Sequence, residues 1–209
     1  MNFTVVNSVM FAFSWLWCVL LGSERITFYP VFFAILSIAL QLHHIRKTSI
    51  PAYCLDFVIA YYALFWGFLM ETLFISLRTI QYATTNSLYS SFPPLWILVL
   101  YPLFALTLNH ALNIFNKRPL IAIPLFSLAA GTNYWLMQRM NALRFTSEWE
   151  NPYVFLIFCW LIFLTIIYFF NKNAASCILS LFHKNNLSKP ITLLYDGDCP
   201  ICKREITHL

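Results

Sequence analysis

The chain has 209 residues, of which 60% are hydrophobic, 19% aromatic and only 10% charged, and its mean hydropathy is +0.70. This composition excludes an ordinary soluble globular protein and is normal for a protein with several membrane helices. The formal net charge of +5 does not indicate nucleic-acid binding, because the Lys and Arg residues stand singly or in pairs between apolar segments. Basic residues placed in this way are typical of the loops that orient a membrane protein.

Six apolar segments follow one another along the chain, each close to the roughly 20 residues that a helix needs to span the hydrocarbon. The first lacks the charged start and the cleavage site of a signal peptide, so we expect an uncleaved helix there. The predicted spans are 3–22, 26–45, 54–77, 93–115, 119–140 and 152–170. The sequence therefore predicts an all-α, multi-pass transmembrane domain over residues 1–170.

The basic residues also predict how these spans are oriented. With six spans, both chain ends lie on the same side of the membrane as the loops after the second and fourth spans. That side carries Arg46, Lys47, Lys117, Arg118, Lys172, Lys184 and Lys189. The other side carries Arg25, Arg78, Arg139 and Arg144. Because Lys and Arg concentrate in cytoplasmic loops, we expect both termini in the cytoplasm.

Polar side chains inside the apolar segments are the candidates for a functional site, since such groups are costly in lipid unless they meet a partner. The predicted orientation sorts them into two layers. The cytoplasmic layer holds His43, His44, Asp56, Asn109, His110 and Asn113. The opposite layer holds Glu71, with Arg78, Asn133, Gln138 and Arg139 at a similar depth.

Helix geometry predicts which of these side chains share a face. Asn109 and Asn113 are four residues apart and would share one, whereas His110 points about 100° away from Asn109. Gly67, four residues before Glu71, would let a neighbouring helix approach the carboxylate. The functional interpretations are a proton relay, a small polar-ligand pocket, or a metal site of the histidines with Asp56. The structural interpretation is a set of interhelical hydrogen bonds. No HExxH or similar spacing supports a metal site, and we expect none.

Three short patterns resemble an uncharacterised bacterial inner-membrane family, a domain of unknown function. They are the run NHALNIF, the G-x-x-x-E from Gly67 to Glu71, and the His43-His44-x-Arg46 ending of the second span. The resemblance covers about residues 2–145. It implies a multi-helix protein of the bacterial cytoplasmic membrane, with the lipid bilayer as its surroundings, and it implies no substrate.

A linker and a short redox-like stretch follow the last span. Residues 171–190 form the predicted cytoplasmic linker, and apolar residues at helical spacing between 174 and 184 suit either a helix along the membrane surface or an ordinary linker helix. Residues 191–195, ITLLY, predict a short buried strand.

The stretch YDGDCPICKREITHL contains the C-x-x-C pair Cys199 and Cys202. A C-x-x-C that opens a helix suits thiol chemistry, because the helix N-terminus favours the Cys199 thiolate. Cys202, one turn further on, is placed to resolve a mixed disulfide. Pro200 suits the first turn of such a helix. Half of a zinc site is the alternative, but no second C-x-x-C follows.

The motif D-G-D-C-P-x-C resembles the DCC family of thiol–disulfide oxidoreductases, which are thioredoxin-like. The resemblance implies that Cys199 is the nucleophile and Cys202 the resolving thiol, with a cytosolic thiol or disulfide as partner. The supporting positions of the motif are Asp196, Gly197, Asp198 and Pro200. A thioredoxin-like fold needs further strands and helices to cover its first strand. We therefore interpret residues 191–209 as an incomplete module that is active only within a longer chain.

The sequence thus predicts a polytopic inner-membrane protein of unknown activity, fused to the start of a redox module. Two other interpretations stay open, in both of which the redox tail is vestigial. One is a small-ligand or proton-coupled membrane transport protein, and the other is a structural membrane subunit. The sequence contains no nucleotide-binding glycine loop, Ser-His-Asp set or haem attachment motif, so no cofactor is expected.

Overall fold

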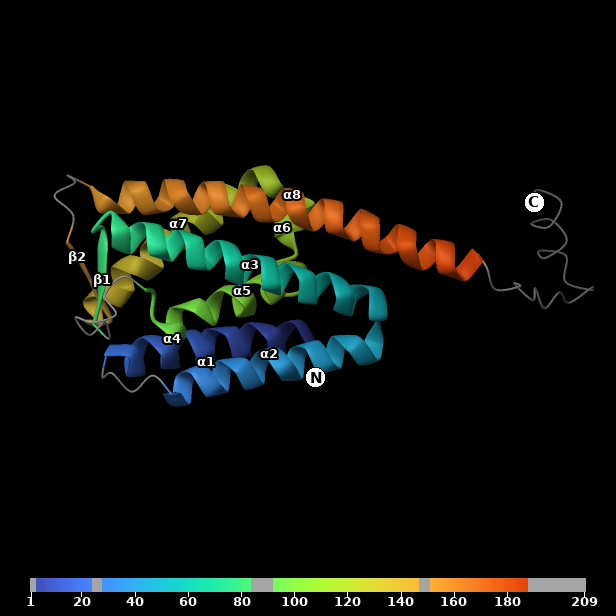
Figure 1. Ribbon diagram of the computed structural model, residues 1–209, viewed down its shortest axis with the longest axis horizontal. Helices are drawn as coiled ribbons and strands as arrows, with labels where there is room; N and C mark the ends of the chain where they lie inside the picture. The colour runs from blue at the N-terminus through green and yellow to red at the C-terminus, as the bar shows by residue number, and fades with distance from the viewer. Residues whose placement is uncertain (1–2, 24–27, 84–91, 147–150, 188–209) are drawn as a thin grey trace, which may run out of the picture.

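Five long helices form the body of the protein (Figure 1). The computed structural model describes residues 3–23, 28–83, 92–146 and 151–187. The long helices are α1 (Phe3–Ser23), α2 (Phe28–Thr48), α3 (Ile50–Ser76), α7 (Pro119–Arg139) and α8 (Pro152–Leu187). All five are long and apolar enough to cross a membrane. The prediction of an all-α, multi-pass membrane protein is confirmed at this level.

The fourth predicted span is not one continuous helix, so the prediction of six continuous spans is wrong. The segment forms three short helices: α4 (Leu95–Leu98), α5 (Leu100–Asn109) and α6 (Ile114–Lys117). The break at Val99 follows from Pro102, which has no N–H for the Leu98 carbonyl and whose ring crowds that carbonyl. The first break in this apolar run is therefore set by one proline, whose effect on the backbone a hydropathy average does not include.

The second break follows Asn109. The backbone N–H groups of His110 and Leu112 both donate to the Thr107 carbonyl, at 3.2 and 2.7 Å, in place of the regular helical pattern. Helix α6 then begins after Asn113. Because the helix stops between them, Asn109 and Asn113 do not share a helix face as expected.

A small antiparallel hairpin joins the ends of α3 and α7. Strand β1 (Ile80–Tyr82) pairs with β2 (Leu143–Phe145), with Gln81 opposite Arg144. Each helix reaches its strand through a residue with positive φ, Arg78 at 51° and Asn141 at 58°, inside a Schellman-type C-cap. Helices α3 and α7 therefore end on the same side of the bundle, and the broken segment α4–α6 makes the return crossing between them.

Helix α3 is the central helix and packs against α2, α5 and α8. Its buried face includes the small residues Ala60, Ala63 and Gly67, which allow close approach. A Cβ added at Gly67 would lie 2.3 Å from Cγ of Tyr101 in α5. The predicted close approach of a neighbouring helix at Gly67 is thus present.

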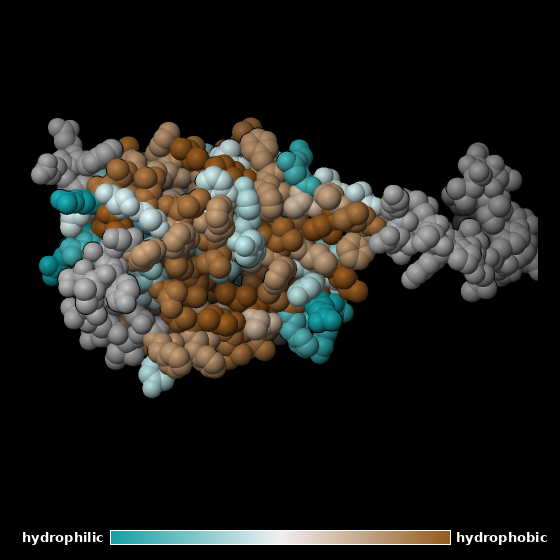
Figure 2. All heavy atoms as spheres, viewed as in Figure 1, coloured by the Kyte–Doolittle hydropathy of each residue, from teal (hydrophilic) through white to brown (hydrophobic). Residues whose placement is uncertain are grey.

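The outer surface is apolar, as expected for a lipid-facing protein. Large hydrophobic side chains point outward, including Leu120 (90% exposed), Phe28 (74%) and Tyr61 (71%). Figure 2 shows this as a broad brown band, with teal residues gathered toward the two ends. Helix α8, at about 1.5 Å per residue, is longer than the roughly 30 Å hydrocarbon layer, and its C-terminal part extends beyond the other helices (Figure 1).

Candidate functional site

Glu71 is the centre of a buried cluster near the hairpin end of the bundle. Its side chain, on α3, is fully buried. Three tyrosine hydroxyls donate to the carboxylate: Tyr82 to Oε2 at 2.5 Å, and Tyr101 and Tyr134 to Oε1 at 2.6 and 2.5 Å. These tyrosines come from β1, α5 and α7. A single carboxylate therefore ties four elements of the fold together.

The tyrosines make burial of this acidic group tolerable. A buried charge is costly unless it is paired or hydrogen-bonded, and hydrogen bonds to a charged acceptor are among the stronger ones. Burial, followed by the neighbouring Glu71, raises the pKa of the Tyr82 hydroxyl well above its ordinary value. Tyr82 therefore keeps its proton and remains a donor.

The partners of Glu71 differ from those expected at its depth. Gln138 accepts a hydrogen bond from Tyr153 at 2.6 Å, and the Arg139 guanidinium lies over the Trp135 ring at 5.3 Å. The carboxylate is satisfied by neutral phenols in place of arginines and amides. Tyrosines in an aromatic-rich apolar chain give no polar signal, so this cluster could not be located from the sequence.

A cavity of about 270 Å³ lies beside the cluster, between α5 and α7. Its walls include Ile97, Leu100, Tyr101 and Phe104 at helical spacing on the α4–α5 side. The α7 side includes Phe126, Ala130, Asn133, Tyr134 and Met137, again at helical spacing. Phe11 of α1, Leu112, Ala129 of α7 and Trp160 of α8 also line it. We call this cavity the α5–α7 slot. Tyr101 and Tyr134 thus face the slot and also bind Glu71.

A second polar cluster surrounds Asp56, whose side chain is 2% exposed at the other end of α3. Asn109 Nδ2 donates to Asp56 Oδ1, and His110 Nε2 lies against Asp56 Oδ2, both at 2.7 Å. Since a carboxylate only accepts, Nε2 carries the hydrogen and the other ring nitrogen, Nδ1, is directed elsewhere. The break in α5 after Asn109 allows both neighbouring side chains to reach one carboxylate.

Two further amides extend this cluster. Asn116 Nδ2 donates to Asn109 Oδ1 at 3.0 Å. Asn171 Nδ2 donates to the same Asn109 oxygen at 2.8 Å and to Asn116 Oδ1 at 3.0 Å. Neither residue was expected in the site, because Asn116 follows the predicted fourth span and Asn171 follows the predicted sixth.

The remaining predicted site residues lie apart from these contacts. His44 stacks on Phe3, whose ring edge also meets His110. His43 and Asn113 are exposed. Cys199, Cys202 and the motif residues Asp196, Gly197, Asp198 and Pro200 lie outside the described residues. Within the part of the chain that is described, no group of three His, Cys, Asp or Glu side chains is arranged to hold a metal.

The two clusters occupy opposite ends of the bundle. Asp56 and Glu71 are separated on α3 by about 22 Å at 1.5 Å per residue, which is less than the thickness of the hydrocarbon. The contacts of Phe3 with His44 and His110, together with those of Asn171, place the start of α1 and the later part of α8 at the Asp56 end. Both polar centres therefore lie inside the bundle, near its two ends.

Fold and surface define a multi-pass helical membrane protein with two buried polar centres. A family model described as "Protein of unknown function (DUF2878)" matches residues 4–166. The chain belongs to this family, which confirms the expected membership in a family of unknown function. The match extends into the first half of α8, beyond the residues that carried the resemblance. It includes Asp56, Glu71 and the three tyrosines but ends before Asn171.

No curated protein and no solved structure matches the chain. The comparisons give no support to the resemblance of residues 191–209 to the DCC family.

Proposed function

We propose that this protein binds a hydrocarbon-chain alcohol from the bilayer in the α5–α7 slot. The observation that carries the proposal is that Tyr101 and Tyr134 line a largely apolar cavity and both donate to Glu71. Ligand sites are typically apolar cavities with a few fixed polar groups, and the slot has this composition.

Access from the bilayer is supported by the way the helices around the slot are spaced. Helices α1 and α7 both contribute to its walls but make no extensive contact with each other. Ala129 of α7 lines the slot and is exposed. An opening between two lipid-facing helices admits a molecule already dissolved in the membrane.

The directions of the two tyrosine hydroxyl hydrogens determine which ligand groups can bind at the polar end of the slot. Both hydroxyl hydrogens are directed to Glu71 Oε1, so the tyrosine oxygens offer only lone pairs to the slot. A ligand group that binds at these two oxygens must donate a hydrogen bond, while the buried Nε1–H of Trp160, which has no partner, can donate to the ligand's own oxygen. The half-buried Asn133 supplies an additional amide on the same wall. A hydroxyl on an apolar chain meets these requirements.

Binding of a matched pair of compounds tests this proposal. We expect 1-dodecanol to bind the purified protein about fivefold more tightly than its methyl ether, because the ether lacks the donor and one hydrogen bond is worth about 1 kcal/mol. Ala130→Phe, which fills the slot, should abolish binding of the alcohol. Leu128→Phe, on the exposed side of the same helix, is the control and should bind normally. Equal binding of alcohol and ether, or normal binding by Ala130→Phe, would contradict the proposal.

We also propose a location and a second activity, both of which rest on sequence. Five basic residues flank the Asp56 cluster, namely Arg46, Lys47, Lys117, Arg118 and Lys172, which favours placing that end in the bacterial cytoplasm. The C-x-x-C motif of Cys199 and Cys202 favours thiol–disulfide exchange with a cytosolic partner. The experiments that test both points are argued in the Discussion.

A further inference from the structure

The amides around Asp56 are oriented by the carboxylate itself. Asp56 Oδ1 accepts a hydrogen bond from Asn109 Nδ2, so the side-chain oxygen of Asn109 points away from Asp56. That oxygen accepts from Asn116 and from Asn171, which fixes the direction of both further amides. The assignment of amide nitrogen and oxygen is thus set by the network, starting from a group that can only accept.

This chain of hydrogen bonds ends in an acceptor that has no partner. Asn171 uses its Nδ2 on two amide oxygens, Asn109 Oδ1 and Asn116 Oδ1. Asn171 is only 4% exposed, and its own Oδ1 is buried and makes no hydrogen bond. A buried acceptor without a donor costs about 1–3 kcal/mol, so a molecule that donates to this oxygen is expected at the site.

His110 belongs to the same network. Its Nε2 lies against Asp56 Oδ2 at 2.7 Å, which leaves Nδ1 available to another partner. The ring is 21% exposed, so a group outside the bundle can reach it. The unpartnered Asn171 oxygen of this network therefore selects a ligand that carries N–H or O–H groups.

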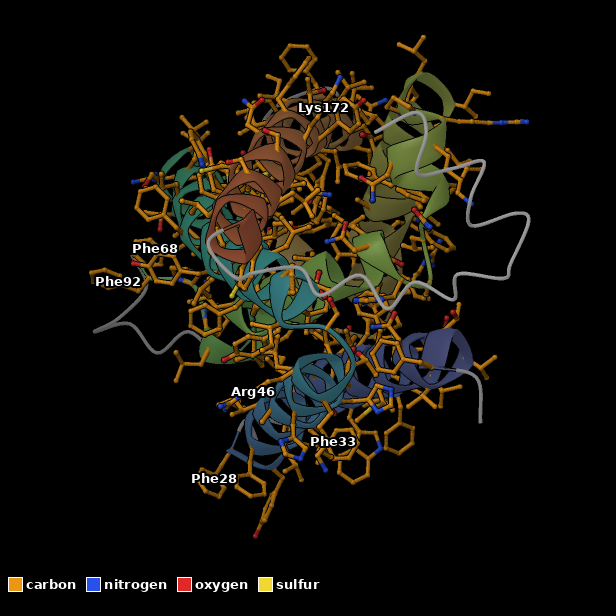
Figure 3. All side chains as sticks on the ribbon, turned by 90° about the vertical axis from the view of Figure 1, so that its right-hand side faces the viewer. Phe28, Phe33, Arg46, Phe68, Phe92 and Lys172 are labelled. Carbon is orange, nitrogen blue, oxygen red and sulfur yellow. The ribbon has the colours of Figure 1, made fainter. Side chains whose placement is uncertain are left out.

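The charges around the network are positive. Asn116 and Asn171 are each followed by an exposed lysine, Lys117 and Lys172. Figure 3 views the bundle from this end and shows Arg46 and Lys172 on different sides of its rim. Among the residues that the structure describes, Asp56 and Glu71 are the only acids, and Glu71 lies at the other end. These positive charges therefore attract a phosphate to the rim of the bundle at this end. The buried acceptor inside the rim favours a ligand that also carries a hydrogen-bond donor.

We propose that the Asp56–His110–Asn171 network is a phospholipid headgroup site that recognises a terminal amine or hydroxyl next to the phosphate. The phosphate lies among Lys117, Lys172 and the other basic residues, and the terminal donor reaches Asn171 Oδ1. This site is separate from the α5–α7 slot and does not depend on it. The position suits a headgroup, because it lies where the hydrocarbon ends and anionic groups attract Lys and Arg.

The methylation series of ethanolamine lipids tests the site. Phosphatidylethanolamine, its N-methyl and N,N-dimethyl derivatives, and phosphatidylcholine share one phosphate and one cationic nitrogen, and only the last lacks an N–H. The purified full chain is loaded from vesicles of each lipid with identical acyl chains, and retained lipid is counted by native mass spectrometry. We expect similar retention of the first three and an about tenfold fall at phosphatidylcholine. Equal retention of all four, or a steady decline along the series, would overturn the proposal.

Variants separate this site from its alternatives. Asn171→Ala should remove the fall at phosphatidylcholine, whereas His43→Ala, at an exposed histidine of the same end, should keep it. Lys117→Gln combined with Lys172→Gln should lower retention of all four lipids alike. Ala130→Phe should leave the series unchanged, so failure of the slot and failure of the headgroup site are distinguishable. A fall that persists in Asn171→Ala would mean that the donor is recognised elsewhere and would overturn the assignment. If Asn171→Ala does not accumulate, the wild-type series decides the outcome alone.

Discussion

The ring of Tyr101 occupies the space that a side chain at position 67 would need. A Cβ on Gly67 would lie 2.3 Å from Tyr101 Cγ, and all three of its closest contacts are atoms of that ring. The same tyrosine donates to Glu71, one helical turn further along α3. The absence of a side chain at Gly67 therefore allows the Glu71 cluster to form.

Gly67→Ala should disturb this cluster more than an equivalent change elsewhere. The added methyl group meets a rigid aromatic ring, and overpacking of this kind costs about 1–3 kcal/mol. The control is Gly131→Ala, whose Cβ would lie 2.6 Å from Cγ1 of Ile157, a branched aliphatic chain that can change rotamer. Thermal unfolding in detergent measures both. A loss of stability in Gly131→Ala as large as in Gly67→Ala would contradict this reasoning.

Replacing Glu71 separates the roles of its charge and its hydrogen bonds. Glu71→Gln keeps an acceptor for Tyr101 and Tyr134 and turns a donor toward Tyr82, which can accept through its own oxygen. Glu71→Leu leaves three buried hydroxyls without their acceptor, each costing about 1–3 kcal/mol. We therefore expect normal or mildly reduced abundance for Glu71→Gln and severe loss for Glu71→Leu. Immunoblotting of membrane fractions measures this, and equal abundance of the two variants would argue against the cluster.

Much of the architecture follows from hydropathy. The five long helices lie where apolar runs of sufficient length predict them. The fourth run fails as a continuous helix because its outcome depends on local chemistry: Pro102 breaks it at Val99, and it ends after Asn109, where Asn109 and His110 bind the two oxygens of the Asp56 carboxylate. A hydropathy average treats all of these positions alike.

The two polar centres were predictable to different degrees. Asp56, Asn109 and His110 were expected in one layer because they are polar in apolar runs, and the structure brings these three together. The partners of Glu71 were not predictable, since Tyr101 and Tyr134 are indistinguishable by pattern from core aromatics. Asn171 was missed because the predicted sixth span ended one residue earlier. The sequence pattern predicts how deep in the membrane a polar residue lies. It does not predict which side chains face one another across the bundle.

Asp56→Asn should reverse the tautomer of His110. The Asn109 amide still needs an acceptor, so the new amide presents its oxygen to Asn109 and its nitrogen to the histidine. His110 must then accept at Nε2 and carry its hydrogen on Nδ1. Imidazole ¹⁵N chemical shifts of selectively labelled protein measure the change. His43, which is exposed, should keep its spectrum, and an unchanged His110 signal would show that Asp56 does not set the tautomer.

Reporter fusions test the orientation. Because α1 starts at the Asp56 end and α8 passes it, a fluorescent protein fused after Leu209 should fold in the cytoplasm. Alkaline phosphatase fused after Ala83, at the hairpin end, should be active in the periplasm. Activity of alkaline phosphatase fused after Leu209, without fluorescence of the matching fusion, would reverse both assignments.

The C-x-x-C motif makes a kinetic prediction. If a helix begins at Cys199, its N-terminus lowers the pKa of that thiol, so a larger thiolate fraction is present near neutral pH. Cys177 is exposed on α8 and serves as the internal reference. We expect iodoacetamide to label Cys199 roughly tenfold faster than Cys177 at pH 7, as for a thiol whose pKa has fallen by about one unit or more.

The pH dependence of that labelling distinguishes a low pKa from simple access. A rate advantage that comes from a lowered pKa of Cys199 should shrink as the pH rises past about 8.5, because the Cys199 thiol is then already fully ionised and gains no further thiolate, whereas an ordinary thiol still does. A faster labelling rate that came only from better access of the reagent to Cys199 would persist at every pH. Peptide mapping of the labelled wild-type protein, with Cys177→Ser as the control for assignment, measures the ratio. Equal rates at pH 7 would remove the support for a redox-active Cys199.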